Sequence, residues 1–245
     1  MKEEHYFYVP EASSRTELPE EEARHAVKVL RLHPGDKIFI TDGCDHIYEA
    51  VVTDVSRNGC CYKIISGEDV RPSWHGLLHL AIAPTKNIDR IEWMVEKCVE
   101  VGVDEISFVD CKCGLRHKLN MERLNRIVVS AMKQSHKARK VIMNDLVSFD
   151  SFIKSVSSEE EKFIAHCLGD NDVFKVRERY IAEALGEGSK TILIGPEGDF
   201  TVDEVAAAIS AGFVPVSLGE SRLRTETAGL YSVIIMNLKN SGKIG

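Results

Sequence analysis

The sequence has no apolar run of the roughly 18 residues that a membrane-spanning helix needs, although 44% of its 245 residues are hydrophobic. Glycine and proline occur at ordinary frequency, which excludes a collagen-like chain. Glu3 and Glu4 stand where a secretion signal needs a basic and then an apolar stretch, so we expect a cytoplasmic protein. A globular chain of this length can bury one or two cores.

Cysteine is present in a pattern that suits neither a disulfide framework nor structural zinc. The seven cysteines are odd in number. Cys60 is adjacent to Cys61, and Cys111 is separated from Cys113 by one residue, which is too close for the usual zinc pairs. We therefore predict reduced cysteines and no metal site.

Nucleotide-binding motifs are also missing. No G-x-G-x-x-G pattern follows a predicted strand. Lys190-Thr191 lacks the preceding glycine of a P-loop and comes before a strand rather than after one. We assign these two residues to an ordinary connection.

The net charge of −7 argues against a nucleic-acid partner, but a polyanion responds to the local field. Residues 112–140 contain nine basic residues and one acid, Glu122. The basic residues are Lys112, Arg116, Lys118, Arg123, Arg126, Lys133, Lys137, Arg139 and Lys140. A solvated helix face is one interpretation, but so many unbalanced charges repel one another without a polyanion, so we favour contact with RNA or phosphate.

The pattern of turns and apolar residues divides the chain near Arg71-Pro72-Ser73, giving predicted domains 1–71 and 72–245. The first domain has predicted strands at 6–9, 37–41, 48–55 and 60–65 and a helix at 20–32. Asn58-Gly59 is a strong hairpin signal. Such spacing predicts a small β-barrel.

The second domain alternates apolar strands with helices. We predict strands at 77–83, 105–109, 162–167, 191–194 and 214–218, helices at 89–101, 121–138, 202–211 and 226–239, and a loop at 157–161. This alternation is typical of an α/β fold with a parallel sheet.

Two loops that follow predicted strands are candidate ligand-binding sites. After the strand at 191–194 come Gly195-Pro196-Glu197-Gly198, whose glycines let backbone amides approach a ligand, and Thr201 with Glu204 predicts a helix-capping box. Ligands of open α/β sheets bind at such strand ends, although a plain tight turn is the alternative.

The second loop follows the strand at 214–218. It brings Arg222, Arg224, Glu220 and Glu226 between a buried strand and an apolar helix. Charged groups at such a position are energetically expensive unless they have a use, which makes the loop a candidate site.

At these two loops the chain resembles the RsmE-type 16S ribosomal RNA uridine-N3 methyltransferases of the SPOUT superfamily. The resemblance rests on Gly195-Pro196-Glu197-Gly198 with Phe200-Thr201 and Glu204, and on Leu218-Gly219 followed by Leu223-Arg224-x-Glu226-Thr227-Ala228. Weaker matches are His25 to Arg31, Lys86 to Val103 and Gln134-Ser135. Lys112-Cys113-Gly114 departs from the family's usual Glu-Arg-Ser, and the sequence does not decide whether Arg116 or Lys118 replaces that arginine.

The resemblance implies a knotted SPOUT methyltransferase domain with a parallel sheet, preceded by a small PUA-like β-barrel that binds RNA. It implies S-adenosyl-L-methionine as cofactor, 16S rRNA or the small ribosomal subunit as substrate, and a homodimer. We expect a cofactor cradle and a set of RNA contacts. The cradle is Gly195, Pro196, Glu197, Gly198, Leu218, Gly219 and Leu223, and the RNA contacts are His25 and Arg31 on the first domain and Lys86, Lys133 and Gln134 on the second.

The chemistry of uridine suggests roles for two further residues. N3 is a poor nucleophile until it loses its proton, after which negative charge spreads over N3 and the flanking carbonyl oxygens. A guanidinium can stabilise that anion, so Arg224 is the candidate electrostatic catalyst. Glu226 is the candidate for orienting Arg224 or accepting the proton, and a helix N-terminal acid is its alternative reading.

Two other functions stay open at this point. The chain could be a SPOUT methyltransferase that acts on a ribose 2′-hydroxyl or a transfer-RNA base. It could also be a non-catalytic ribosome-assembly factor, for which Lys112-Cys113-Gly114 is the motive. Nucleoside analysis of the product separates the first from uridine-N3 methylation, and cofactor binding without transfer identifies the second.

Overall fold

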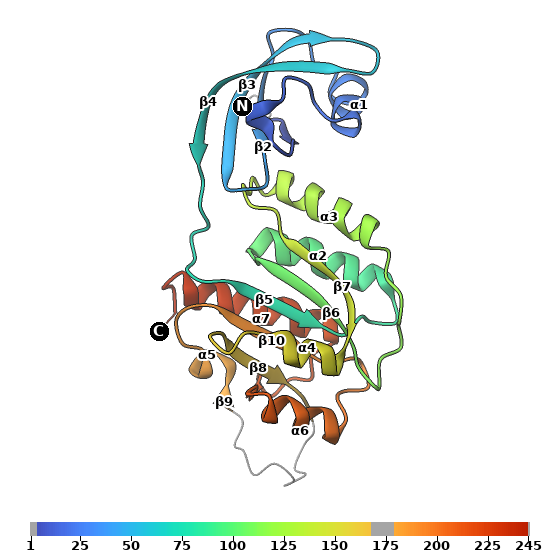
Figure 1. The fold of residues 1–245 in the computed structure, drawn as a ribbon, viewed down its shortest axis with the longest axis vertical. Coiled ribbons are helices and arrows are strands. Elements are labelled where there is room, and N and C mark those ends of the chain that lie inside the picture. Colours follow the sequence, from blue (N-terminus) through green and yellow to red (C-terminus); the bar gives the residue numbers. More distant parts are fainter. Residues whose placement is uncertain (1–3, 168–178, 245) are drawn as a thin grey trace. The chain divides into compact units, whose positions relative to one another are not determined.

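A computed structural model describes residues 4–167 and 179–244 (Figure 1). The expectation about a secretion signal rests on Glu3 and Glu4, and Glu3 lies outside the described residues. Two compact units are present: Met1–Pro72 with Val129–Lys140, and Ser73–Val128 with Val141–Gly245. The domain ranges 1–71 and 72–245 stay a prediction, and the grouping of 129–140 with the first unit was not foreseen. None of the described helices is long and apolar enough to cross a membrane.

The first unit contains a four-stranded sheet in the order β1-β2-β3-β4. These strands are β1 (Tyr6–Tyr8), β2 (Lys37–Thr41), β3 (His46–Val55) and β4 (Cys60–Asp69). The β1 strand runs parallel to β2, and the other pairs are antiparallel, with the predicted Asn58-Gly59 turn between β3 and β4. The core packs Phe7, Ile38 and Ile40 against Ala23 and Ala26 of helix α1 (Glu20–Lys28). A short 3-10 helix, η1, spans Ala12–Ser14.

Helix α1 is shorter than predicted. The sequence pattern extends to Leu32, but the helix ends at Lys28. The reason is local: the amides of both Val29 and Leu30 donate to the His25 carbonyl, and Arg31 takes a left-handed φ of 54°. The apolar residues keep a helical spacing beyond Lys28, but the backbone leaves the helix there.

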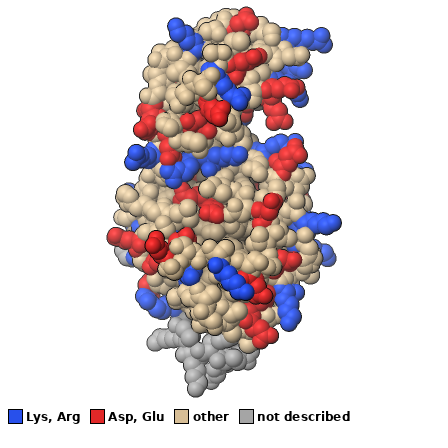
Figure 2. Space-filling model, viewed as in Figure 1, with Lys and Arg blue, Asp and Glu red and all other residues tan. Residues whose placement is uncertain are grey.

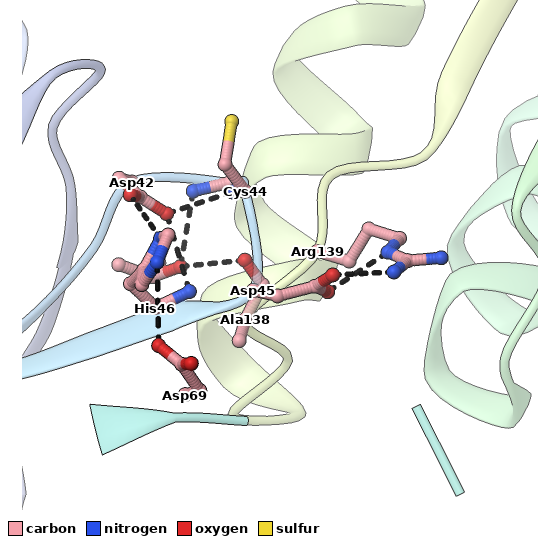
Figure 3. A network of polar contacts seen from close by, with 9 residues as sticks. Asp42, Cys44, Asp45, His46, Asp69, Ala138 and Arg139 are labelled. Carbon is pink, nitrogen blue, oxygen red and sulfur yellow. Dashed lines mark hydrogen bonds and ion pairs between the residues drawn. The ribbon is translucent and has the colours of Figure 1, made fainter. Parts of the chain in front are cut away.

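The segment after helix α3 (Met121–Gln134) completes the first unit. Thr41 Oγ1 donates to the Ala138 carbonyl at 3.0 Å, and the Lys140 amide donates to the Gly43 carbonyl at 3.0 Å. The Arg139 guanidinium binds both carboxylate oxygens of Asp45 (Figure 3). In the same view, Asp42 accepts hydrogen bonds from the Cys44 amide and the His46 ring, which also lies near Asp69. The predicted helix 121–138 therefore ends at Gln134 because its last residues bind the β2–β3 turn.

The second unit is built on a seven-stranded parallel sheet in the order β7-β6-β5-β10-β8-β11-β9. Its strands are β5 (Leu78–Ile82), β6 (Glu105–Asp110), β7 (Ile142–Ser148), β8 (Glu161–Ala165), β9 (Arg179–Tyr180), β10 (Lys190–Ile194) and β11 (Val214–Ser217). The predicted α/β class with a parallel sheet is confirmed. The sequence missed β7 and β9, and it placed Glu161 in a loop although it begins β8.

Helices cover both faces of this sheet (Figure 1). Helices α2 (Ile88–Val101) and α7 (Thr225–Asn240) lie on one face, where Gly229 packs so closely that an added Cβ would be 2.9 Å from Ile82 Cδ1. Helices α4 (Phe149–Ser155) and α6 (Val202–Ser210) cover the other face. The short helix α5 spans Ile181–Ala184. How the chain threads through the expected knot stays a prediction.

A chain of buried polar groups crosses this sheet at His79. The ring Nδ1 lies 3.1 Å from Thr191 Oγ1, and Nε2 lies 2.7 Å from Ser107 Oγ. Thr191 donates to Glu160, and Asn144 Nδ2 donates to Ser107. Each of these residues comes from a different strand or its flank, so the network pins the strand register. Burial lowers the pKa of His79, with Glu105 and Glu160 opposing the shift.

The His79 network predicts acid sensitivity. Between the lowered pKa of the folded state and the ordinary histidine value of about 6.5, the unfolded chain binds a proton that the folded chain does not. This group's stabilisation is therefore complete above about pH 6.5 and is lost as the pH falls below it. Urea denaturation from pH 8 to pH 5 should show a smaller loss of stability for His79→Gln than for the wild type. Parallel curves for the two proteins would contradict this prediction.

Candidate functional site

A cavity of about 340 Å³ lies at the carboxyl ends of three neighbouring strands, β10, β8 and β11. Its wall contains seven of the predicted cofactor-binding and catalytic residues: Gly195, Pro196, Glu197, Leu218, Gly219, Leu223 and Arg224. The two predicted loops therefore meet in one site. This position agrees with the general rule that open α/β sheets bind ligands beyond their strand ends.

The turn after β10 holds the ends of two other strands in place. Glu197 Oε1 accepts a hydrogen bond from the Lys86 amide at 2.9 Å, beyond the end of β5. Asp199 Oδ2 accepts from the Cys167 amide at 2.8 Å, beyond the end of β8. Asp199 has a left-handed φ of 64° and also accepts from the Phe200 amide. The side chains of this turn thus fix the wall of the cavity.

The predicted capping box at the start of α6 is confirmed, and it has a second use. Thr201 and Glu204 exchange the two expected hydrogen bonds. The other carboxylate oxygen of Glu204 accepts from the Lys112 amide at 2.8 Å. The neighbouring Gly198 packs against Cys113. A Cβ added at Gly198 would lie only 3.1 Å from the Cys113 Cβ. A part for Gly198 in cofactor binding stays a prediction.

Arg116 acts as a brace within the second unit. Its Nε donates to the Thr85 carbonyl at 3.0 Å, and another guanidinium nitrogen donates to the Lys86 carbonyl at 2.5 Å. Together with Glu197, which binds the Lys86 amide, it clamps the connection from β5 to α2. The structure therefore gives Arg116 a structural task beside the Lys112-Cys113-Gly114 segment.

The second loop leads from an exposed arginine, Arg224, into a helix whose first turn carries a buried carboxylate, Glu226. Arg224 lines the cavity and is exposed, and it precedes α7 without making a side-chain cap. Glu226, in the first turn of α7, is only 6% exposed. Its Oε1 lies 3.6 Å from Arg90 Nε, and its buried Oε2 has no hydrogen-bond partner among residues 4–167 and 179–244. Glu226 is therefore paired with Arg90 of α2.

Sequence reasoning missed several residues of this wall. Arg90 comes from α2, and Ala165, His166 and Cys167 come from the end of β8. The strand-end rule could have found the last three, since 162–167 was already a predicted strand. Arg90 had no such signal, because only the packing of α2 beside α7 brings it to the cavity. Among the described residues, no group of three or more His, Cys, Asp or Glu is arranged to hold a metal ion.

The predicted RNA contacts lie on both units. His25 and Arg31 are exposed on the first unit, and Lys86 is exposed on the second. Lys133 and Gln134 were expected on the second domain but group with the first unit, where Lys133 Nζ lies 2.6 Å from Glu22 Oε1. Gln134 is exposed. The segment groups this way because its side chains and backbone bind α1 and the β2–β3 turn.

The basic residues at 112–140 are less unbalanced than the sequence indicates. Four of them have carboxylate partners, namely Arg123 with Glu92, Arg126 with Glu122, Lys133 with Glu22 and Arg139 with Asp45. Figure 2 shows acidic and basic side chains interspersed over one face. The argument from repulsion overestimated the positive field, because three of these acids come from distant parts of the chain.

Comparison with known proteins decides the family. The RNA methyltransferase domain model matches residues 73–237, and the RNA methyltransferase PUA domain model matches residues 18–65. The chain belongs to the RNA methyltransferase family. The whole cavity of this RNA methyltransferase, from Arg90 to Ala228, lies within the first match. The second match covers α1, β2, β3 and the first part of β4.

Relatives of this RNA methyltransferase extend over nearly its full length. A crystal structure described as a probable rRNA-methyltransferase from Porphyromonas gingivalis is 38% identical, with a TM-score of 0.88 over 98% of this chain and 99% of that one. Ribosomal RNA small subunit methyltransferase E from Neisseria gonorrhoeae, bound to S-adenosyl methionine, is 28% identical with a TM-score of 0.80, covering 96% and 97%. A protein of the same name from Rickettsia conorii is 27% identical over 94% of this chain and 92% of its own length.

Proposed function

We propose that this chain transfers the methyl group of S-adenosyl-L-methionine to N3 of a specific uridine in 16S ribosomal RNA. The observation that carries the proposal is the cavity at three parallel strand ends, with Arg224 on its wall and Glu226 two residues further on. The names of the full-length relatives support ribosomal RNA as the substrate and a methyl group as the group that is transferred.

The cavity suits S-adenosyl-L-methionine as cofactor. Its volume of about 340 Å³ lies at the lower end of the roughly 300–1,000 Å³ typical of small-molecule sites. Val216, Leu218 and Leu223 offer apolar contacts for the adenine, and the backbone at Gly195 and Gly219 can hydrogen-bond its polar edge. When bound, the cofactor supplies a methyl group already activated by its sulfonium. The protein then has only to hold the two reactants in line.

The residues beside the cavity provide the rest of the chemistry. Uridine N3 loses its proton, the N3–carbon bond forms as the carbon–sulfur bond breaks, and S-adenosylhomocysteine leaves. Arg224 donates to a uracil carbonyl oxygen as negative charge develops. Glu226 accepts the N3 proton, a role supported by its Oε2, which has no hydrogen-bond partner within the described part of the chain. Arg90, 3.6 Å from the other oxygen, holds that carboxylate in place.

The assembly and location of the enzyme complete the proposal. We assign a homodimer, which the exposed Trp93 of α2 and Leu238 of α7 support because the two helices lie side by side. His25, Arg31, Lys86, Lys133 and Gln134 are proposed RNA contacts, and the enzyme meets its substrate in the cytoplasm. Sedimentation of the purified chain tests the dimer, and a monomer at micromolar concentration would contradict it.

The deciding experiment measures methyl transfer from labelled S-adenosylmethionine. The substrates are 16S rRNA and small ribosomal subunits, and the RNA is digested to nucleosides after the reaction. Label in N3-methyluridine supports the proposal. Label in a 2′-O-methylated nucleoside, label in transfer RNA, or cofactor binding without transfer would each contradict it.

Gly219 gives a prediction for cofactor affinity. Its φ of 111° is strained for any residue with a side chain, whereas among residues 4–167 and 179–244 an added Cβ would meet nothing closer than Tyr180 Cε2 at 4.0 Å. Gly219→Ala should therefore act through backbone strain alone and weaken binding of S-adenosylhomocysteine about five- to thirtyfold, equivalent to roughly 1–2 kcal/mol. Isothermal titration measures the affinity.

Gly35→Ala is the matched control for this variant. Gly35 has a φ of 97°, no atom of the described residues lies within 4 Å of an added Cβ, and it belongs to the first unit. The control should lose similar stability without any loss of affinity for S-adenosylhomocysteine. Equal affinity in both variants would remove Gly219 from the cradle.

A further inference from the structure

Three rings lie nearly parallel in the first unit. Tyr6 of β1 packs against Phe39 of β2 with 5.0 Å between ring centroids and 16° between planes. His136, two residues beyond the end of α3, packs against Tyr6 at 4.0 Å and 16°. Tyr6 and Phe39 are partly buried, whereas His136 is exposed. The cluster therefore presents one of its rings to solvent.

The backbone at His136 is one that favours glycine. Its φ is 54°, in the left-handed region. The Lys137 amide donates to the Met132 carbonyl at 2.9 Å, and the His136 amide donates to the Lys133 carbonyl at 3.2 Å, so His136 closes the C-terminus of α3. Helices commonly end with glycine at this position because a side chain is strained there. A histidine at a strained and exposed position is a reason to look for a function of its ring.

Cationic residues follow this ring in the sequence. Lys137, Arg139 and Lys140 follow it within four residues. The Lys140 ammonium lies 5.4 Å from the centroid of Tyr8, and Arg139 is fixed by Asp45 (Figure 3). The hydrogen bonds from Thr41 and to Gly43 hold the same segment on the sheet. An exposed flat ring in a segment that carries cationic side chains is complementary to a nucleotide, which presents a base and a phosphate.

We propose that His136 is a stacking platform for an unpaired base of the RNA substrate, with Lys137 and Lys140 beside the flanking phosphates. This inference rests on the proposed function, because it takes RNA as the substrate. Specific recognition of RNA depends largely on unstacked bases that pack on aromatic or histidine side chains. The site lies outside residues 18–65, which match the PUA model, and it exists because 129–140 joins the first unit.

One substitution removes the ring without adding backbone strain. His136→Gly removes the ring and relieves the strained backbone, so the melting temperature should be unchanged or higher. The KM for 16S rRNA should rise about fivefold to a hundredfold, the range expected for one stacked base. The kcat at saturating RNA and the affinity for S-adenosylhomocysteine should be unchanged. His136→Phe keeps a ring without a charge and should restore the KM.

Direct binding separates this proposal from the proposed function. An oligouridine and a duplex of equal length serve as probes, with His33→Ala, an exposed histidine in the same unit, as control. Weaker binding of His136→Gly to the oligouridine alone supports stacking, even if the wild type methylates no uridine. Unchanged binding, equal loss on the duplex, or failure of His136→Phe to restore affinity would each overturn the platform.

Discussion

Arg224→Ala should lower kcat for methyl transfer to 16S rRNA about 10²- to 10³-fold, the loss typical of removing one donor from a developing oxyanion. The side chain lines the cavity and makes no cap for α7, so its removal leaves the helix start intact. Charge develops on the uracil carbonyls only as N3 loses its proton. The loss should therefore appear in kcat rather than in the affinity for S-adenosylhomocysteine.

Two further variants sharpen this result. Arg224→Lys keeps the charge but not the planar donor, and it should recover only part of the rate. Arg57→Ala removes an exposed arginine beside the Asn58-Gly59 turn and should leave the rate unchanged. The measurement is label in N3-methyluridine after nucleoside digestion. A rate within threefold of wild type for Arg224→Ala would exclude the proposed catalytic role.

Lys190→Met should destabilise the protein by about 3–5 kcal/mol, because it leaves the partners of a buried cation without their donor. The Lys190 side chain is fully buried at the start of β10. Its ammonium donates to the Gly186 carbonyl at 2.6 Å and to Asn240 Oδ1 at 2.5 Å, and it lies 3.6 Å from Glu161. Burial lowers the pKa of this lysine. A methionine fills the volume but donates nothing.

The test is urea denaturation at pH 7. Lys154→Met is the control, because Lys154 is exposed on α4 and a surface change of this kind stays within about 0.5 kcal/mol. Asn240 also binds the His75 and Gly188 carbonyls, so Asn240→Ala should approach the same loss. A loss below 1 kcal/mol for Lys190→Met would show that its partners find other donors.

The pattern of residues was sufficient for most elements and for the place of the site. Continuous apolar runs predicted β5 and β10, and the loops at 195–198 and 218–228 met in one cavity as strand-end geometry requires. The β7 strand was missed because Asn144 and Asp145 interrupt its apolar residues. Asn144 is there to donate to Ser107 and Glu105 across the sheet, a contact that no local pattern contains.

Contacts between distant segments explain the other differences. Arg90 and Glu226 are 136 positions apart, and only the packing of α2 beside α7 joins them. Lys133 was expected on the second domain because it follows the predicted boundary near Arg71-Pro72-Ser73, but its partner is Glu22. The resemblance of motifs supplied the chemistry, whereas the pairing of charges required the three-dimensional structure.

The grouping of 129–140 with the first unit has a consequence for synthesis. Chains emerge from the ribosome at about 5–20 residues per second, and N-terminal domains usually fold first. Here the hydrogen bond from Thr41 cannot form until Ala138 has been synthesised, and the ion pair of Glu22 cannot form until Lys133 has been synthesised. The first unit therefore completes its fold only after much of the second has been made. A fragment that ends at Pro72 should lack the ring of His136 over Tyr6 and expose the β2–β3 turn.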